Sequence, residues 1–207
     1  MSQIESGQPY YDQTFSGLDL AGLSLQATEF NDCEFNGCIF TEASLTSCRW
    51  VDCTFRDCDL SLADLTGSAF SGVNFEDCKL VGVNWAQADW NHPRLDNRLN
   101  FKACSLNHST FIGLKLHQAK IIDCQAANLD FRGADLRQAD FSGSDLTDSL
   151  FGDTDLRKTD FRQARNYSLS PLDNKLKGAL FSLPEAMSLL YHLDIHLDGE
   201  WDRGIER

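Results

Sequence analysis

Several features that would point to a membrane, secreted or basic protein are missing from this sequence. It has no run of about 18 apolar residues, so no segment is predicted to cross a bilayer. Its first fourteen residues, MSQIESGQPYYDQT, lack the basic and apolar regions of a secretory signal. Positive charge is scarce, with 18 Lys and Arg against 31 Asp and Glu, a formal net charge of −13. We therefore expect a cytoplasmic protein with no direct nucleic-acid partner and no membrane partner, because both bind cationic patches.

Motifs for metal, nucleotide and catalytic chemistry are also missing. The eight cysteines form no CxxC pair, and spacings such as Cys33 to Cys38 are five residues. His192 and His196 lie four residues apart, but the predicted C-terminal helix ends between them. No phosphate loop or catalytic triad motif occurs. The sequence thus predicts a non-enzymatic protein with no cofactor and no metal.

What the sequence does have is a five-residue period. From Phe15 to Leu95, every fifth residue is Leu, Phe or Trp, and after a slip of one residue the series continues from Phe101 to Phe161. These 30 positions, called position i below, contain 13 of the 14 phenylalanines. Position i−2 holds small residues and all eight cysteines, which we interpret as compact apolar fillers. Positions i−1, i+1 and i+2 are polar or Gly, a pattern that fits neither a helix nor a plain strand.

A chain that turns by about 90° after every five residues satisfies this pattern, because it directs i and i−2 inward. Four sides close a 20-residue coil, and coils stack at about 4.8 Å, like neighbouring strands. The stacking predicts a ladder of Phe15, Phe35, Phe55 and Phe75, with glycines at the tight turns. We expect an N-terminal cap over residues 1–12, coils over 13–165 with the slip at about 96–100, and a C-terminal segment over 166–207.

The repeats, such as ADLRQ (134–138) and ADFSG (139–143), resemble those of the pentapeptide-repeat family over about residues 10–165. The resemblance implies an all-β solenoid, a right-handed quadrilateral β-helix of pentapeptide repeats with a short C-terminal helix.

The C-terminal segment reads differently from the repeats. Ser182 and Glu185 predict a capping box that opens a helix over about 183–192, and Leu193, Ile195 and Leu197 alternate with polar residues as in a short strand. One interpretation is an intramolecular cap on the open end of the coil stack. The other is a cap that also pairs two chains end to end. The residues predicted to form that dimer contact are Leu183, Met187, Leu190, Leu193, Ile195 and Leu197.

This ending resembles the dimerisation module of the topoisomerase-protecting subgroup, which includes Qnr, MfpA, McbG and AlbG, and the stretches 75–85 and 166–190 look closest to AlbG. The resemblance implies a homodimer that binds DNA gyrase, or topoisomerase IV, as a mimic of duplex DNA. It would protect the enzyme from a poison such as albicidin, a microcin or a quinolone, and inhibit supercoiling at high concentration. Plasmid-type Qnr proteins carry two projecting loops, whereas this register slips by one residue, which argues against loop-dependent quinolone protection.

The acidic residues predicted to face the enzyme fall into two groups. Stacked columns 20 residues apart contain Asp12, Asp32 and Asp52, and also Asp57 and Asp77. The others occupy position i−1 in later coils, where Asp also bonds local backbone groups, a structural role that stays open beside the functional one. These are Asp135, Asp140, Asp155 and Asp160. The alternative to gyrase binding is a scaffold or adaptor that displays its faces to another protein partner.

Overall fold

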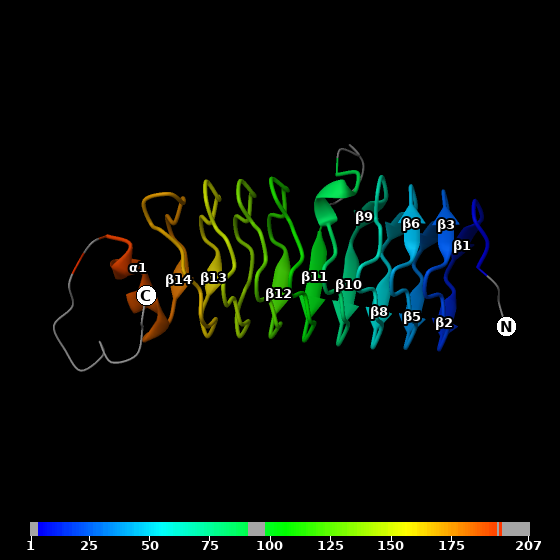
Figure 1. Cartoon of the computed structure of the whole chain (residues 1–207), viewed down its shortest axis with the longest axis horizontal. Helices are drawn as coiled ribbons and strands as arrows, with labels where there is room; N and C mark the ends of the chain where they lie inside the picture. Colours follow the sequence, from blue (N-terminus) through cyan, green and yellow to red (C-terminus); the bar gives the residue numbers. More distant parts are fainter. Residues whose placement is uncertain (1–3, 91–97, 194, 196–207) are drawn as a thin grey trace.

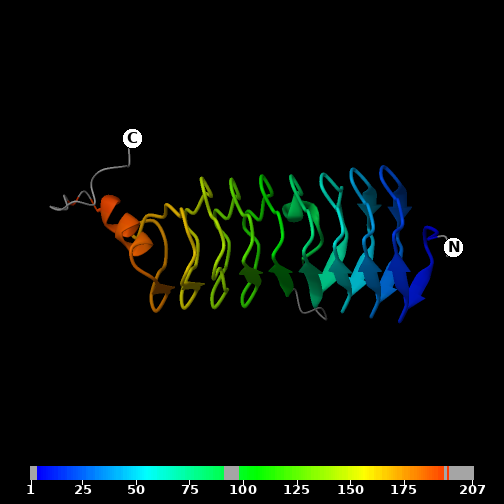
Figure 2. The same ribbon diagram turned by 90° about the horizontal axis from the view of Figure 1, so that it is seen from below.

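The computed structural model describes residues 4–90, 98–193 and 195, which form a rod of stacked coils (Figures 1 and 2). Every strand pair is parallel, and the rod is a β-solenoid of about 8 turns, as the five-residue period predicts. The N-terminus lies at one end of the rod and a short helix at the other. None of the described helices has the length and apolar character that crossing a membrane requires.

The strands lie on the sides of the coils, so that each sheet runs along the rod. One sheet contains β1 (Pro9–Tyr11), β4 (Glu29–Asn31), β7 (Arg49–Val51) and β9 (Ala69–Ser71). A second contains β2 (Thr14–Ser16), β5 (Glu34–Asn36), β8 (Thr54–Arg56), β10 (Val73–Glu76), β11 (Leu99–Lys102) and β12 (Lys120–Ile122). The pairs β3 (Ser24–Gln26) with β6 (Ser44–Thr46), and β13 (Asp160–Phe161) with β14 (Leu180–Phe181), complete the sheets.

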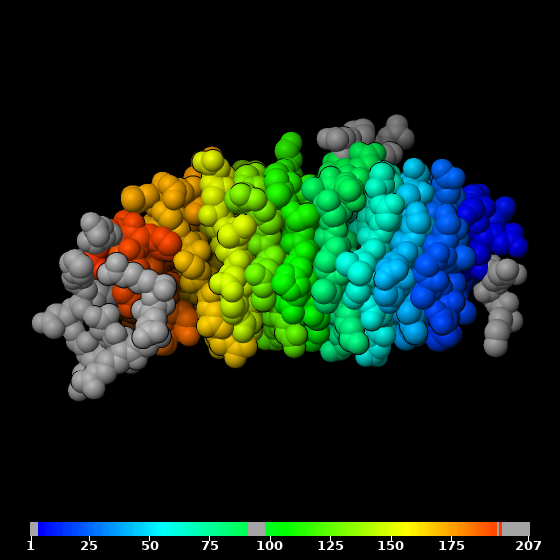
Figure 3. Space-filling view, viewed as in Figure 1, coloured from blue at the N-terminus to red at the C-terminus, as the bar shows by residue number. Residues whose placement is uncertain are grey.

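Stacked aromatic rings fill the axis of the rod. Phe35 lies between Phe15 and Phe55, with ring centroids 5.0 and 4.7 Å away, and Phe75 continues the ladder at 5.0 Å. The predicted ladder is therefore confirmed. Trp50 and Trp85 are fully buried at position i, so they belong to the core. Because each ring packs on the coils above and below it, each coil depends on its neighbours for stability. The space-filling view shows the coils packed along the rod (Figure 3).

Position i−2 also contributes hydrogen bonds to the stack. The Cys58 thiol donates to the carbonyl oxygen of Phe35 in the preceding coil at 3.3 Å, and the Ser144 hydroxyl donates in the same way to Ile121 at 2.7 Å. All eight cysteines are buried and free. Burial raises the pKa of the Cys53 thiol to about 12. The predicted apolar filler is thus also a hydrogen-bond donor that joins adjacent coils.

The register break is larger than the sequence predicts. Phe75 pairs with Phe101, Lys79 with Ser105 and Asn84 with Thr110, so partners lie 26 residues apart where other coils have 20. Six residues are therefore inserted at this point: the five-residue phase slips by one residue, as expected, but one further repeat is inserted with it. Leu95, the predicted coil position, and the segment 91–97 lie outside the described residues. The helical turn η1 (Trp85–Gln87) precedes the insertion.

Candidate functional site

The first candidate surface is formed by acidic corners in the N-terminal half of the rod. Asp12, Asp32 and Asp52 occupy position i+2, where the chain turns with φ of 50, 53 and 51°. The preceding residues pair in register, Tyr11 with Asn31 and Asn31 with Val51, so the three aspartates stack in one column. All three are exposed, and none forms an ion pair among the residues that the structure describes. We name this set the acidic column.

A second pair of exposed aspartates lies at the next corner. Asp57 and Asp77 have φ of 52 and 53°, and their coils pair through Arg56 and Glu76. Asp is one of the few non-glycine residues that readily adopts positive φ, so these positions have a local reason to be Asp or Asn. Their charge has no such reason: like charges one coil apart repel by somewhat under 1 kcal/mol per pair at high dielectric. The conformation explains an Asn at these corners as well as an Asp, but not the choice of a charge.

The predicted aspartates of the C-terminal half are engaged in local structure. Asp135 Oδ1 accepts a hydrogen bond from the backbone N–H of Arg137, and Asp135 forms a two-point ion pair with the same guanidinium at 2.8 and 2.6 Å. Asp155 with Arg157 and Asp160 with Arg162 repeat this arrangement, while Asp140 accepts from the backbone N–H of Ser142. The local backbone role predicted for position i−1 is therefore confirmed.

The arginine partners change the electrostatics of these carboxylates. The side chains of Asp135 and Asp155 are only 22 and 14% exposed. The hydrogen bonds from Arg137 and Arg157 hold the pKa of each carboxyl below its ordinary value. The carboxylates of Asp135 and Asp155 are thus ionised, but the positive charges of Arg137 and Arg157 largely neutralise them. Asp135, Asp155 and Asp160 of the second predicted group are paired with arginine, whereas the aspartates of the N-terminal group have no ion pair among the residues that the structure describes.

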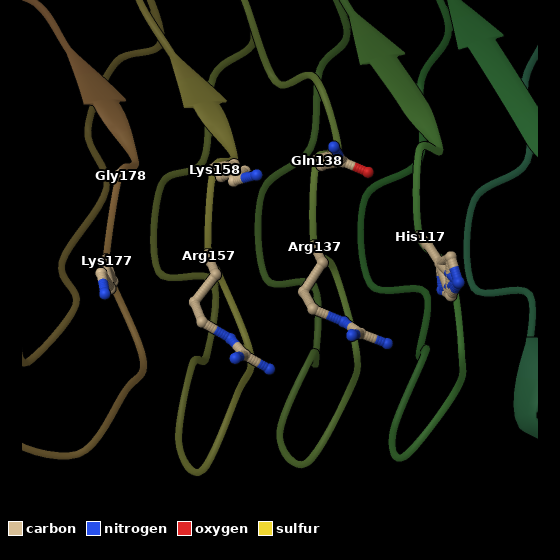
Figure 4. A pocket seen from close by; sticks show the side chains of 7 residues that line it. All are labelled: His117, Arg137, Gln138, Arg157, Lys158, Lys177 and Gly178. Carbon is tan, nitrogen blue, oxygen red and sulfur yellow. The ribbon is translucent and has the colours of Figure 1, made fainter.

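Sequence reasoning missed a basic surface on the C-terminal half. On the side of the coil that carries β1 and β4 near the N-terminus, position i+1 holds a basic residue in four successive coils: His117, Arg137, Arg157 and Lys177 (Figure 4). Pairing of Lys115 with Asp135, Asp135 with Asp155 and Asp155 with Lys175 places them one above another. With Gln138, Lys158 and Gly178 they line a groove of about 580 Å³. We name this surface the basic groove; the 20-residue spacing of its cations is the signal that could have revealed it.

The C-terminal end of the rod is capped and apolar. Phe181 stacks on Phe161 with a centroid distance of 5.2 Å, and Leu189 packs against the core. The helical segment consists of η2 (Glu185–Met187) followed by α1 (Ser188–Tyr191). The sides of the rod carry few exposed large apolar residues, whereas several lie around this cap. Those around the cap are Leu172, Leu180, Leu183, Tyr191, Leu193 and Ile195.

The predicted capping box is wrong. Pro184 occupies the N-cap position of η2, with no side-chain cap hydrogen bond. The Ser182 hydroxyl instead accepts a hydrogen bond from the backbone N–H of Gln163 in the preceding coil. Ser182 bonds to the coil stack and not to the helix, because the backbone N–H groups of the last coils also need hydrogen-bond partners.

The predicted dimer residues are only partly exposed. Leu183, Leu193 and Ile195 are 76, 36 and 46% exposed, while Met187 and Leu190 are half-buried. Leu193 lies in a turn and Ile195 outside any strand, so the strand expected there is not found in the described part; Leu197 lies outside it.

The side chains that commonly bind metal ions are scattered over the described part of the chain. No group of three His, Cys, Asp or Glu residues that could hold a metal ion occurs within the described ranges. His192 Nε2 lies 3.1 Å from the Ser168 hydroxyl, and His196 lies outside those ranges. The acidic column, the basic groove and the apolar C-terminal end are the candidate functional surfaces.

Comparison with known proteins places the sequence in one family. The profile described as "Pentapeptide repeat region" matches residues 28–98 and 84–161. Among curated proteins, none matches the sequence significantly.

Solved structures show the same fold. A trypsin-treated variant of QnrB1, described as a plasmid-mediated fluoroquinolone resistance protein, is similar with a TM-score of 0.62 and 22% identity over 93% of this chain and 91% of its own. Full-length QnrB1 is similar with a TM-score of 0.56 and 23% identity over 92% of each chain. At these identities the likeness concerns the fold alone.

Proposed function

The chain belongs to the pentapeptide repeat family, and we propose that it binds a type II topoisomerase, DNA gyrase, by imitating duplex DNA with its acidic N-terminal coils. By occupying the groove in which the enzyme holds DNA, it would inhibit supercoiling at high concentration. At lower concentration it would free the enzyme from a poison such as albicidin, a microcin or a quinolone. The description of the similar QnrB1 as a fluoroquinolone resistance protein supports this proposal.

The observation that carries the proposal is the set of exposed, unpaired carboxylates at the N-terminal corners. Residues 1–98 contain 15 acidic and 5 basic side chains, a net charge of −10, whereas residues 99–207 contain 16 and 13, a net charge of −3. Like-charge stacking is a cost to the fold, and a partner with a cationic groove would offset that cost on binding. The acidic column, together with Asp57 and Asp77, is therefore the proposed contact surface.

Dimer formation would extend this surface. We place the dimer contact at the apolar C-terminal end, with Leu183 and Leu193 at its centre, because exposed apolar patches of this kind mark interaction sites. Two chains joined there would carry −26 over roughly 70 Å, about one charge per 3 Å, against about one per 1.7 Å for B-DNA. The acidic columns would then lie at the two outer ends of the pair.

The six-residue insertion bears on the choice of poison. The expectation against loop-dependent quinolone protection assumed that the register breaks by a single residue. The strand register shows instead that six residues are inserted, so that expectation no longer holds. Quinolones therefore stand beside albicidin and microcins as candidate poisons.

A supercoiling assay with matched variants tests the contact surface. Asp12→Asn/Asp32→Asn/Asp52→Asn removes three charges and keeps residues that tolerate positive φ. Asp135→Asn/Asp155→Asn/Asp160→Asn removes three charges from the other group. We expect the first variant to inhibit gyrase at least about tenfold less well than the wild type, and the second to change inhibition by less than about twofold, because its carboxylates are neutralised already. Equal losses would refute the assignment of the contact, and no effect of the wild-type protein on any topoisomerase at micromolar concentration would favour the scaffold alternative.

Light scattering tests the dimer contact. Leu183→Glu/Leu193→Glu should convert the dimer to a monomer, because it buries two charges in an apolar contact. Ile112→Glu, at a side chain 45% exposed on the side of the rod, is the control and should leave the mass unchanged. A wild-type monomer, or a dimer that survives Leu183→Glu/Leu193→Glu, would disprove the contact.

A further inference from the structure

The basic groove is a local exception on an acidic protein. The side of the rod between Lys115 and Gly178 carries six cations and two carboxylates, a net charge of +4 with His117 counted as neutral, whereas the whole chain carries −13. The cations are Lys115, Arg137, Arg157, Lys158, Lys175 and Lys177. Asp153 and Asp173 belong to the preceding side of the coil and do not line the groove. Cations gathered in this way create a local positive potential that the net charge conceals.

The two carboxylates on this side, Asp135 and Asp155, position the basic side chains through ion pairs. Asp135 lies 3.8 Å from His117 Nδ1 and 2.6 Å from Arg137 Nη2, and Asp155 lies 4.0 Å from Arg137 Nε and 2.6 Å from Arg157 Nη2. Each carboxylate therefore stands between the cations of two successive coils. The arginines use Nε and Nη2 for these contacts, so in the described part of the chain Nη1 of each remains available to a ligand. Arg137 and Arg157 are 43 and 46% exposed, which keeps those donors accessible.

The spacing of the cations identifies the ligand. Four stacked basic residues, from His117 to Lys177, span three coil steps, or about 14 Å. Along that length one strand of B-DNA advances by about four nucleotides and presents about four phosphates. An extended acidic peptide would present only about three side chains on one face over the same distance, about 6.7 Å apart. A nucleic-acid strand thus supplies one charge for each basic residue, and an acidic peptide does not.

We propose that the basic groove binds the phosphodiester backbone of a nucleic acid that runs along the rod. The net charge of the chain led to the opposite expectation, because it averages over two halves of unlike composition. Release of counterions from the nucleic acid drives such binding in spite of a net negative protein. The contacts are to the backbone, so the binding is independent of base sequence. This site lies on the C-terminal half, away from the acidic column, and does not depend on topoisomerase binding.

Fluorescence anisotropy with a labelled duplex DNA, and with a labelled single strand of the same sequence, tests the proposal. With four phosphates neutralised, affinity for the duplex should fall by about 100-fold between 50 and 200 mM salt, and affinity for the single strand by about 50-fold. The lower Kd at the same salt concentration identifies the preferred source of phosphates, while each salt response measures how many phosphates are neutralised. Arg137→Gln/Arg157→Gln/Lys177→Gln should remove most of the binding and most of this salt dependence.

A variant with the same change of charge is the control. Arg132→Gln/Arg162→Gln/Arg165→Gln removes three cations from other sides of the same coils and should bind like the wild type. Circular dichroism of both variants would check that they keep the fold. Three results would each overturn the proposal: no binding by the wild type at 50 mM salt, an equal loss in both variants, or competition by poly-glutamate as effective as competition by unlabelled DNA at equal charge.

Discussion

The N-terminal and C-terminal halves of this rod share one coil and one core but treat their surface charges in opposite ways. In the first half, aspartates at the corners stand exposed and stacked, as Asp32 does between Asp12 and Asp52. In the second half, aspartates at position i−1 gain arginine partners, as Asp135 and Asp155 bind both backbone N–H groups and arginines. The same fold thus carries an acidic column at one end and a basic groove at the other. The two proposed partners, one cationic and one anionic, correspond to these two surfaces.

The core gives the largest expected difference between the halves. Phe55 stacks on aromatic rings on both sides, at 4.7 and 5.0 Å, whereas Phe141 stacks on Phe161 at 5.2 Å and on Ile121 opposite. We expect Phe55→Ala to lower the free energy of unfolding by about 4 kcal/mol and Phe141→Ala by about 1 kcal/mol less, because it loses one aromatic pair fewer. Urea denaturation measures both. Equal costs would show that the aromatic ladder adds nothing beyond buried area.

Position i−2 provides a smaller difference, because thiols predominate there in the first half and hydroxyls in the second. Ser144 donates to Ile121 and accepts from the backbone N–H of Cys124 at 2.9 Å. Ser144→Ala should lower the free energy of unfolding by about 1–3 kcal/mol, since it leaves both backbone groups unpaired. Ser144→Cys should cost less, because Cys58 makes the equivalent bonds to Phe35 and Cys38. If thermal unfolding shows Ala to be tolerated as well as Cys, the bonds between coils contribute nothing.

Removing surface charge gives the smallest effect on stability, with opposite signs in the two halves, and in the C-terminal half that effect depends on pH. Arginine lowers the pKa of Asp135 and Asp155, so their contribution to stability is present above the ordinary carboxyl pKa and lost as pH falls through the lowered value. Arg137→Gln/Arg157→Gln should therefore destabilise the protein at pH 7 and leave it unchanged near pH 2.

The acidic column should respond in the opposite direction. Asp12→Asn/Asp32→Asn/Asp52→Asn removes repulsion of somewhat under 1 kcal/mol per pair and should stabilise the protein at pH 7. Melting temperatures across this pH range measure both variants. The same sign for both would mean that the two halves do not differ electrostatically as described.

The sequence predicted the interior far better than the surface. Apolar residues at every fifth position, with small residues at i−2, leave few ways to build a core, and Phe15 stacks on Phe35 as that logic requires. The five-residue period did not reveal the six-residue insertion, because Leu95 follows Trp90 by five residues and so continues the pattern by coincidence. Only the pairing of Phe75 with Phe101 distinguishes an inserted segment from a further side of the coil.

The surface was harder to predict because charge was summed over the chain. Five aspartates of the predicted contact are exposed, but the ion pairs of Asp135, Asp155 and Asp160 depend on arginines two residues away, whose side-chain direction no pattern gives. The basic groove was accessible to the same 20-residue spacing that revealed the acidic column, since His117, Arg137, Arg157 and Lys177 follow it.

Competition with DNA tests the central claim most directly. Binding of DNA gyrase to the Arg137→Gln/Arg157→Gln/Lys177→Gln variant, which keeps the acidic column intact, would be measured while the concentration of duplex DNA is raised. Mimicry of a duplex predicts that the apparent Kd increases in proportion to the DNA concentration, because both ligands occupy one groove. An apparent Kd that does not change when gyrase is saturated with DNA would contradict the account.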